Sequence, residues 1–372
     1  MRRRISTSCQ NCCLRCSTGG LGYIGSHTAL QLLAAGAEVL LADNFANSAP
    51  AVEDRLRSVS RASQQQLRVL RLDLRDKDKV MRLFKEEKID AVIHYAGEKA
   101  PRTLLLSSAP SSPAAAAPAP AAAAAAALKS VGESVQMPLM YYENNVGGTC
   151  NLLQAMEASG VKTLVFSSSA TVYAAKPKMQ INEKDPLGPS NPYGHSKAFI
   201  EQILKDVHAA DSSWRVSILR YFNPVGAHPS GLLGEAPQQP NNLLPVLQQV
   251  AAGQQQLLQV FGSDWDTPDG TGVRDYLHVD DLAAGHLAAL RKLLEAPGGL
   301  LMIHNLGTGV GHSVLELKSL FEEASGRKIP FKVVGRRPGD LAYVVADPSL
   351  AEKELGWRAE RSIRWVFLDK RN

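Results

Sequence analysis

Short apolar runs alternate with amphipathic stretches along roughly the first 223 residues of the chain. The stretches between the runs have helical periodicity: in residues 76–88, for example, Val80, Leu83 and Phe84 fall on one face and charged residues on the other. Strands that are apolar on both faces and separated by helices predict a doubly wound α/β domain with a parallel sheet. The predicted strands are 37–43, 67–73, 89–97, 161–169 and 214–223.

The pattern loosens after residue 223. Pro, Gly and polar residues punctuate the segments 223–245, 260–281 and 335–340. We therefore expect a smaller mixed α/β lobe over 223–372 that contributes loops to a cleft, with its late strand and helix segments partly returning to the first domain. The first domain is expected to span 18–222, after a basic tail over 1–17.

The charge and composition exclude several classes of protein. The chain has a formal net charge of +5, but Arg2, Arg3, Arg4 and Arg15 all precede the first acidic residue, Glu38, so the tail supplies most of the excess. A nearly neutral body predicts no nucleic-acid partner. The Ala-rich stretch is interrupted by Pro and Ser, so no apolar run reaches the length of a membrane span.

Four of the five cysteines lie in the tail, in two overlapping C-x-x-C pairs: Cys9, Cys12, Cys13 and Cys16. A structural zinc site normally takes its second ligand pair from a separate turn, and the sequence offers none, so we predict no metal site. The lone Cys150 argues against a disulfide scaffold and favours a reducing compartment, the cytoplasm. The basic, acid-free tail also resembles an organellar transit peptide, or reflects an inaccurate sequence start.

The first chemical motif is TGGLGYIGSH, at residues 18–27. Its glycines Gly19, Gly22 and Gly25 let a backbone approach a pyrophosphate closely, and the helix that follows directs its positive end at that charge. Asp43 ends the next strand, 18 residues after Gly25. A carboxylate there bonds ribose hydroxyls and repels a 2′-phosphate, so the motif predicts NAD rather than NADP.

The strand expected before this glycine loop contains a charge. It reads CCLRCS, which places Arg15 in the most buried strand of the predicted sheet. An unpaired buried charge costs several kcal/mol. Either Arg15 is solvated, or these residues do not form the strand; the sequence favours the second alternative.

The second motif joins a Ser-ended strand to a helix. Ser167, Ser168 and Ser169 close the run 161–169, and Tyr193 and Lys197 are spaced i, i+4 on the helix that begins near Asn191. An ammonium and a positive nicotinamide ring both stabilise a phenolate, which makes tyrosine a usable base. We therefore predict that Tyr193 moves a proton, Lys197 tunes it and bonds the nicotinamide ribose, and Ser169 holds the reacting alcohol oxygen.

Residues 18 to about 357 resemble the extended short-chain dehydrogenases, and most closely the UDP-glucose (UDP-galactose) 4-epimerases. The resemblance rests on GGLGYIGSHTALQLL, DNFANS, VIHYAG, SVGESVQMPLMYYENNVGGT, LVFSSSATVY, NPYGHSKAFIEQIL, LRYFNPVGAHPSG, PNNLLP, DGTGVRDYLHVDDLA, NLGTGVGHSVLE and RRPGD, which keep the family's order. Related sugar-nucleotide 4,6-dehydratases carry an Asp-Glu pair where this chain has Ala170 and Thr171, so elimination is not expected.

The resemblance implies a Rossmann-like domain, NAD as cofactor, a UDP-sugar substrate and a homodimer. It implies that Tyr193 removes the proton of the sugar 4-hydroxyl, that NAD takes hydride from C4, and that hydride returns to the opposite face of the 4-keto sugar. Besides the residues named above, the implied cofactor contacts are Tyr23, Ile24, Asn44, Asn47, Asp73, Leu74, Tyr95, Ala96, Gly97, Lys129, Asn144, Ser167 and Tyr221. The implied substrate contacts are Ser169, Tyr193, Asn223, Asn242, Leu243, Gln259, Phe261, Arg274, Arg337 and Asp340.

The resemblance also implies what some of these residues do. It implies that Arg274 and Arg337 clamp the two phosphates by charge-assisted hydrogen bonds and that Phe261 packs on uracil. Val344 lies near the position that in the family tunes tolerance for N-acetylated sugars, and its middle size suggests room for UDP-GalNAc and UDP-GlcNAc. The alternatives are an epimerase of another UDP-sugar, such as UDP-xylose or UDP-glucuronate, and a catalytically silent NAD-binding protein.

The run from Glu98 to Ala127 interrupts the resemblance. The family joins the strand end HYAG directly to a short Leu-Lys connection, so these residues are an insertion, too rich in Ala, Pro and Ser to pack a core and expected to be disordered. The insertion leaves two candidates for the cofactor-side lysine, Lys99 and Lys129. Lys129 has the better local match, in LKSVGESV, and is the one we predict.

Overall fold

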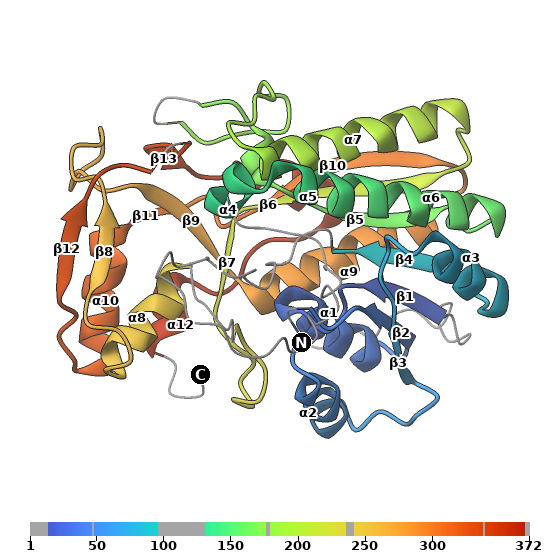
Figure 1. Cartoon of the computed structure of the whole chain (residues 1–372), viewed down its shortest axis with the longest axis horizontal. Helices are drawn as coiled ribbons and strands as arrows, with labels where there is room; N and C mark the ends of the chain where they lie inside the picture. Colours follow the sequence, from blue (N-terminus) through green and yellow to red (C-terminus); the bar gives the residue numbers. More distant parts are fainter. Residues whose placement is uncertain are drawn as a thin grey trace, which may run out of the picture.

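A parallel sheet of seven strands forms the centre of the larger part of the molecule (Figure 1). The computed structural model describes residues 14–46, 48–95, 131–175, 179–235, 242–337 and 339–368. In spatial order the strands are β10 (Leu300–Leu306), β6 (Arg215–Tyr221), β5 (Thr163–Ser169), β4 (Ala91–His94), β1 (Leu14–Thr18), β2 (Glu38–Asp43) and β3 (Leu67–Arg71). This order confirms the predicted doubly wound α/β class, because β4 and β1 meet where the direction of winding changes.

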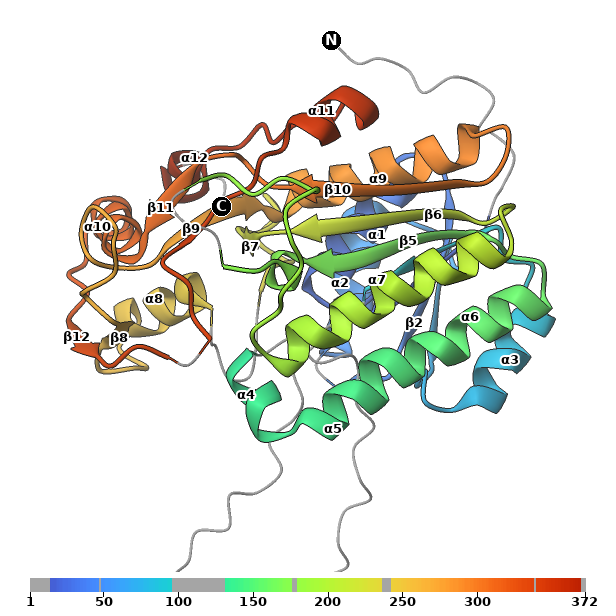
Figure 2. The same cartoon turned by 90° about the horizontal axis from the view of Figure 1, so that it is seen from above.

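Helices cover both faces of the sheet, as Figure 2 shows from above. One apolar core lies under α1 and α9 and the other under α3 and α6, and the strands β2, β4, β5, β6 and β10 contribute side chains to both. The helices around the sheet are α1 (Tyr23–Ala34), α2 (Ala51–Ser60), α3 (Lys77–Glu86), α4 (Val131–Gln136), α5 (Pro138–Tyr141), the π-helix η2 (Tyr142–Gly147), α6 (Gly148–Ala158), the 3-10 turn η3 (Ala170–Val172), α7 (Pro192–Ala210), α9 (Val279–Glu295) and α11 (Ser349–Leu355).

The five apolar runs chosen from the sequence all contain a sheet strand, and each predicted end lies within three residues of the observed one. The signal was strong for β2, β4, β5 and β6, which are buried along nearly their whole length, whereas in the edge strand β3 only Leu67 is buried. The helical pattern of residues 76–88 is also confirmed: α3 begins after Asp76, whose side chain accepts a hydrogen bond from Lys79 N–H, and it buries Val80, Leu83 and Phe84.

The strand before the glycine loop corrects the predicted domain boundary. Residues 14–18 form β1 between β2 and β4, so the sheet domain begins four residues before the predicted boundary at residue 18. Whether these residues belong to the native start of the chain stays a prediction. Arg15 is 7% exposed, and its guanidinium forms an ion pair with Asp90, the residue just before β4, with Nη1 3.5 Å from Asp90 Oδ2. Cys16 is fully buried in the same strand.

The smaller lobe has more regular structure than its sequence indicated. Residues 260–281, which read as a punctuated loop, contain the end of β8, the strand β9 and the start of α9. The proline and glycine residues lie in the turns between these short elements, which made the whole segment resemble a loop. Its strands pair with strands far away in the chain, and such pairing leaves no pattern in the local sequence. The lobe contains β7 (Asn223–Val225), α8 (Leu243–Ala251), β8 (Leu258–Phe261), β9 (Val273–His278), β11 (Gly311–Ser313), α10 (Val314–Ser325), β12 (Phe331–Val334), β13 (Tyr343–Val344) and α12 (Ile363–Leu368).

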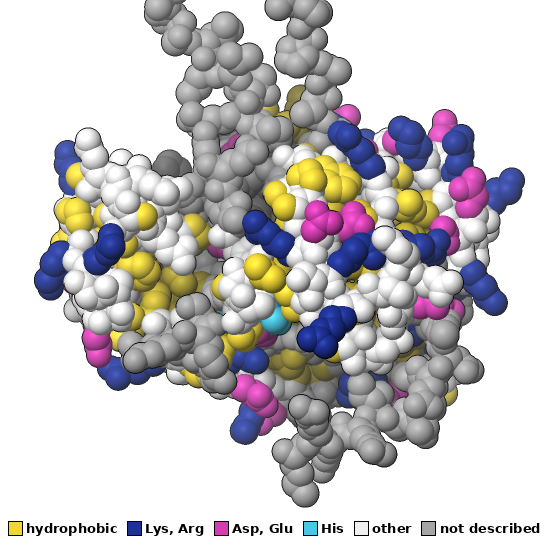
Figure 3. All heavy atoms as spheres, turned by 90° about the horizontal axis from the view of Figure 1, so that it is seen from below, with side chains coloured by type: hydrophobic (Ala, Val, Ile, Leu, Met, Phe, Trp, Pro, Cys, Tyr) yellow, Lys and Arg dark blue, Asp and Glu magenta, His cyan; other side chains and the backbone are white. Residues whose placement is uncertain are grey.

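The surface of the described residues matches the neutral body expected from the sequence. On the face shown in Figure 3, Lys and Arg side chains are interspersed with Asp and Glu side chains. None of the helices built from described residues combines the length and the apolar character needed to cross a membrane.

Candidate active site

The glycine loop connects β1 to α1 at the carboxyl end of the sheet, and its glycines are required by close backbone contacts. A Cβ on Gly25 would lie 2.6 Å from the carbonyl oxygen of Gly19, and Gly19 itself has φ of +69°. Helix α1 begins after Gly22, with no side-chain cap and no acidic residue in its first turn. The helix therefore presents free backbone N–H groups and an uncompensated positive end to the adjoining cavity.

Asp43 ends β2 and anchors this loop. Its Oδ2 accepts a hydrogen bond from Leu21 N–H at 3.0 Å, and its Oδ1 accepts from Phe45 N–H and from the Ser48 hydroxyl, each at 2.9 Å. Burial raises the pKa of the Asp43 carboxyl, and these three hydrogen bonds act in the opposite direction. The structure thus gives Asp43 a local role, holding the glycine loop in place, in addition to the ribose contact predicted for it.

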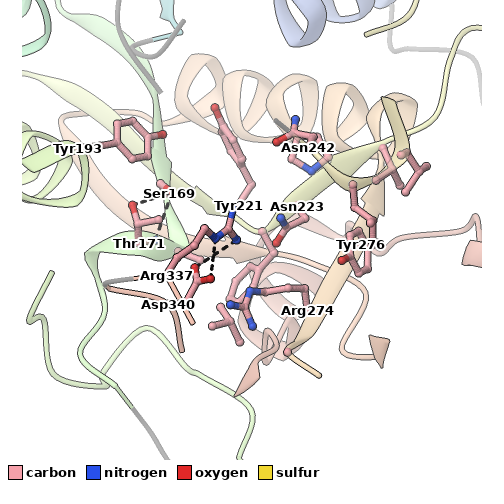
Figure 4. A pocket seen from close by; sticks show the side chains of 18 of the residues that line it. Ser169, Thr171, Tyr193, Tyr221, Asn223, Asn242, Arg274, Tyr276, Arg337 and Asp340 are labelled. Carbon is pink, nitrogen blue, oxygen red and sulfur yellow. Dashed lines mark hydrogen bonds and ion pairs between the residues drawn. The ribbon is translucent and has the colours of Figure 1, made fainter. Parts of the chain in front are cut away.

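Ser169 and Tyr193 lie together on one wall of the cavity (Figure 4). Ser169 Oγ accepts hydrogen bonds from Thr171 N–H at 3.2 Å and from the Thr171 hydroxyl at 3.0 Å, which leaves its own O–H to donate. Burial raises the pKa of Tyr193 to about 12, and a hydrogen bond with Ser169 opposes the rise. The Tyr193 phenol is therefore a weaker acid than free tyrosine.

Lys197 lies one turn after Tyr193 on the same buried face of α7. Its Nζ is fully buried, lies 5.6 Å from the centre of the Tyr193 ring, and donates a hydrogen bond to the carbonyl oxygen of Ser167 at 2.8 Å. Burial lowers the pKa of Lys197 well below its usual value, while the negative charge of Glu201 opposes this shift. Tyr193 and Lys197 therefore lie close together on one face of α7, as their spacing predicts, and their roles in the reaction stay a prediction.

The smaller lobe supplies the opposite wall, where Arg337 already has partners. Its guanidinium donates to the Asp340 carboxylate, from Nε at 2.8 Å, and lies 4.4 Å from the centre of the Phe261 ring. Arg274, on β9, also lines the cavity, and burial lowers its pKa. Arg337 adds to that shift while Tyr276 and Asp340 oppose it, so the two guanidinium groups are close enough to repel each other.

These walls enclose one cavity of about 940 Å³ between the sheet and the smaller lobe. The predicted residues that line it are Gly19, Gly22, Tyr23, Ile24, Gly25, Tyr95, Ser169, Tyr193, Tyr221, Asn223, Asn242, Leu243, Gln259, Phe261, Arg274, Arg337, Asp340 and Val344. The predicted residues that the structure describes but that do not line the cavity are Asp43, Asn44, Asp73, Leu74, Asn144, Ser167 and Lys197. Asp73, for instance, forms an ion pair with Arg75 at 2.8 Å.

Several predicted positions lie outside the described residues, so the structure leaves their roles as predictions. They are Asn47, Ala96, Gly97 and Lys129, together with the alternative Lys99, the insertion 98–127, and the tail cysteines Cys9, Cys12 and Cys13.

The cavity also has lining residues that the sequence analysis did not assign to it, including Thr171, Tyr173, Glu235, Trp265 and Tyr276. Alternation along β9 offered a signal for Tyr276, because it stands two residues after Arg274 and so shares its face. Glu235 accepts a hydrogen bond from Asn242 at 2.5 Å, a contact that no local pattern announces.

Comparison with known proteins agrees with this architecture. A model of the NAD dependent epimerase/dehydratase family matches residues 116–305, and a model described as GDP-mannose 4,6 dehydratase matches residues 17–108. UDP-glucose 4-epimerase 2 of Arabidopsis thaliana is 48% identical over 353 residues, covering 95% of this chain and 92% of that protein. The chain belongs to the family of UDP-glucose 4-epimerases.

Other members of this epimerase family are similarly close. UDP-glucose 4-epimerase of Bacillus subtilis (strain 168) is 47% identical over 353 residues, covering 95% of this chain and 94% of that protein. The crystal structure of UDP-glucose 4-epimerase from Bifidobacterium longum in complex with NAD+ and UDP superposes with a TM-score of 0.83 at 44% identity, covering 95% of this chain and 96% of that one. The match extends over both the sheet and the smaller lobe.

Proposed function

We propose that the protein interconverts UDP-galactose and UDP-glucose by NAD-dependent 4-epimerisation, with UDP-GalNAc and UDP-GlcNAc as further candidate substrates. One observation carries the proposal: Tyr193 and Ser169 lie in a single cavity between the glycine loop on one side and Arg274 and Arg337 on the other. A proton-transfer pair placed between a dinucleotide cradle and a cationic wall suits a reaction on a sugar attached to a diphosphate.

The cofactor half of the cavity fits NAD. Gly19, Gly22 and Gly25 leave the backbone uncovered at the start of α1, and the uncapped N-terminus of that helix suits a pyrophosphate. Asp43 gives the end of β2 a negative charge, which disfavours a ribose 2′-phosphate. When bound, NAD supplies the acceptor and donor of hydride at carbon 4 of the sugar.

The chain's own residues supply the proton chemistry. In the proposed reaction, the Ser169 O–H donates to the sugar 4-oxygen, and Tyr193 takes and returns the 4-hydroxyl proton. The ammonium of Lys197, 5.6 Å from the Tyr193 ring centre, supports the phenolate. Thr171 carries a hydroxyl rather than a carboxyl group, so the elimination step of a dehydratase lacks an acid at this position.

Substrate binding requires Arg337 to change partners. In the structure it lies over Phe261, the proposed uracil platform, and is paired with Asp340, the proposed ribose contact. A UDP group replaces both contacts, since its phosphates take the Arg337 guanidinium and its uracil takes the face of Phe261. The mutual repulsion of Arg274 and Arg337 is relieved when the diphosphate lies between them.

The test is conversion of UDP-galactose by the purified protein without added NAD, followed by chromatography of the sugar nucleotides. Epimerase function predicts UDP-glucose as product, and Tyr193→Phe should lower kcat by about 100-fold or more while the protein still binds NAD. Conversion of UDP-xylose or UDP-glucuronate alone would select the other epimerase. A wild-type protein that contains NAD and converts none of these sugars would be the silent NAD-binding alternative.

We also propose that two copies pair through α5 and α7. Leu139 on α5 is 81% exposed and Phe199 on α7 is 49% exposed. The centre of the Phe199 ring lies 5.9 Å from that of Tyr142, the residue directly after α5, so the two helices lie side by side here. The apolar surface formed by Leu139, Tyr142 and Phe199 suits a twofold interface, in which this surface of one copy packs against the same surface of the other. Leu139→Asp should shift the mass measured by light scattering from two chains to one, whereas Val310→Asp, at a separate position 53% exposed, should not.

Cys16 and Cys150 are both free thiols. They support the proposed reducing compartment, the cytoplasm.

A further inference from the structure

Helix α7 continues the line of Tyr193 and Lys197 with a third buried ionisable residue. Tyr193, Lys197 and Glu201 are spaced i, i+4, i+8 and therefore share one face of the helix. Glu201 is fully buried, as is Lys197. The sequence analysis assigned the first two residues to chemistry and gave the third no role.

Glu201 is held by partners on two strands of the sheet. Arg220, on β6, donates two hydrogen bonds to its carboxylate, from Nε at 2.9 Å and from Nη2 at 2.5 Å. The hydroxyl of Ser168, on β5, donates a third at 2.6 Å. Ser168 stands between Ser167, whose carbonyl oxygen accepts from Lys197, and Ser169 in the cavity wall. The carboxylate thus fixes α7 against the strand end that carries the reacting groups.

The same network reaches the cavity by a second route. Arg220 Nη1 donates to the Tyr173 hydroxyl at 3.0 Å, and its guanidinium lies 4.8 Å from the centre of that ring. Tyr173 lines the cavity, and its hydroxyl donates to Asn305 Oδ1 at 2.6 Å. Arg220 also donates to the carbonyl oxygen of Glu183 at 3.2 Å. The ion pair therefore connects α7, β5, β6 and β10 directly beneath the proposed reaction centre.

The charges in this region explain why an anion is needed. Lys197 has one charged donor group in a fully buried position, and a lone buried ammonium is costly. The ionisable groups facing it from the surrounding elements are Tyr193 and Glu201 on α7, His94 on β4, and Arg220 on β6. Burial lowers the pKa of His94 to about 3, and the Lys197 charge adds to that effect, so His94 is neutral there. Among these groups Glu201 is the anion that favours the ammonium.

We infer that Glu201 is a positioning residue for the reaction, which keeps Lys197 charged and in place beside Tyr193 through the Arg220–Glu201–Ser168 network. This inference rests on the proposed function. With Lys197, Glu201 and Arg220 all ionised, the group carries one net positive charge, and the member that approaches the Tyr193 ring is Lys197, at 5.6 Å. Loss of the Glu201 charge releases the Lys197 proton and leaves the positive charge on Arg220, whose guanidinium bonds to the residue at position 201 and to Tyr173.

The first variant is Glu201→Gln, which keeps the shape of the side chain and removes its charge. We expect kcat near pH 7.5 to fall by about tenfold or more, and the alkaline limb of the kcat profile to move to lower pH by about one unit. KM for UDP-galactose should change by less than about threefold, because Arg274, Arg337 and Asp340 are untouched. Glu201→Asp keeps the charge and should retain the wild-type alkaline limb even where the rate is lower.

A matched control lies on the same helix. Asp206 is exposed on α7 and accepts a hydrogen bond from Gln202. Asp206→Asn removes the same charge from the solvent side and should leave both kcat and its pH profile unchanged. Tyrosinate absorbance of the NAD-bound protein gives a readout that does not need turnover: after subtraction of the Tyr193→Phe spectrum, Glu201→Gln should titrate at higher pH than wild type.

A purely structural role is separated by the double variant Glu201→Gln/Arg220→Met. Removing one partner of a buried pair leaves an unpaired charge and can prevent folding, whereas removing both does not. If Glu201 acts through its charge on Lys197, the double variant folds and moves the kcat profile and the tyrosinate titration back towards wild type, because it removes one negative and one positive charge together. Wild-type values for either quantity in Glu201→Gln, or a double variant as shifted as Glu201→Gln, would overturn the inference. An inactive wild type would defeat the proposed function instead, and the tyrosinate titration would still test Glu201.

Discussion

Arg15 offers a direct test of how the central sheet tolerates a charge. It lies in β1 opposite Val39 of β2 and Ala91 of β4, both of which belong to the apolar core under α1 and α9. The Arg15 side chain is 8% exposed and that of its partner Asp90 is 38% exposed. The 3.5 Å approach is not a hydrogen bond, because Arg15 Nη1 has no hydrogen-bond partner among the described residues.

The substitution Arg15→Met is therefore expected to stabilise the protein. The lost ion pair is worth at most about 1 kcal/mol, because Asp90 is partly solvated. Removing a buried donor without a partner recovers about 1–3 kcal/mol, and the methionine side chain keeps most of the apolar contact made by the arginine stem. The free energy of unfolding should rise by about 1–3 kcal/mol, within the range known for replaced buried ion pairs.

Equilibrium unfolding in urea, followed by circular dichroism with NAD at one fixed concentration, measures the change. Arg15→Lys is the control that keeps the charge, and it should not stabilise. Asp90→Asn should destabilise by about 1–2 kcal/mol, because it leaves the guanidinium without its anion. If Arg15→Met lowered the free energy of unfolding by more than about 1 kcal/mol, the ion pair would contribute net stability and the reasoning would be refuted.

Three further predictions concern the loop, the thiols and the buried histidines. Gly25→Ala should remove copurified NAD, measured in acid extracts, because the new Cβ would lie 2.6 Å from the carbonyl oxygen of Gly19. The control Gly298→Ala, which has open space around its Cβ, should keep its NAD. Full NAD content in Gly25→Ala would contradict this prediction. Burial raises the pKa of Cys16 to about 12, so peptide mapping after native alkylation should find Cys150, which is partly exposed, labelled first; equal rates would count against it. Burial lowers the pKa of His94 to about 3 and those of His278 and His286 to about 4. Below the unfolded value of about 6.5 the unfolded chain takes up protons that the folded chain does not, so stability is complete above that pH and is lost towards pH 4, by up to about 1.4 kcal/mol per pH unit for each imidazole. Equal urea midpoints at pH 7.5 and 5.5 would contradict this sign.

The sheet was predictable because its information is local. Each buried strand is a continuous apolar run, and each helix between strands shows its periodicity within a dozen residues, as α3 does. The glycine loop and the Tyr193–Lys197 pair were found for the same reason, since their spacing is set within one turn or one helix. Eighteen of the predicted site residues line one cavity although they come from segments between residues 19 and 344. Topology brings them together, because the carboxyl ends of parallel strands share one edge.

The parts that were missed depend on contacts between distant segments. The hydrogen bond from Tyr173 to Asn305, for example, spans 132 positions of the chain. Arg15 was misjudged for the same reason. Its charge argues against a buried strand when the sequence is read locally. The Asp90 carboxylate that pairs with it lies just before the neighbouring strand β4, far away in the chain.

The pKa of Tyr193 decides when the proposed base is active. Burial raises this pKa to about 12, and a hydrogen bond with Ser169 opposes the rise, so the phenol keeps its proton at neutral pH. Burial also lowers the pKa of Lys197, whose ammonium is the proposed support of the phenolate. A further positive charge in the cavity shifts the balance towards phenolate, and the nicotinamide ring of oxidised NAD carries one. Bound NAD would therefore favour the Tyr193 phenolate that the proposed reaction uses, which would link proton removal to the presence of the hydride acceptor.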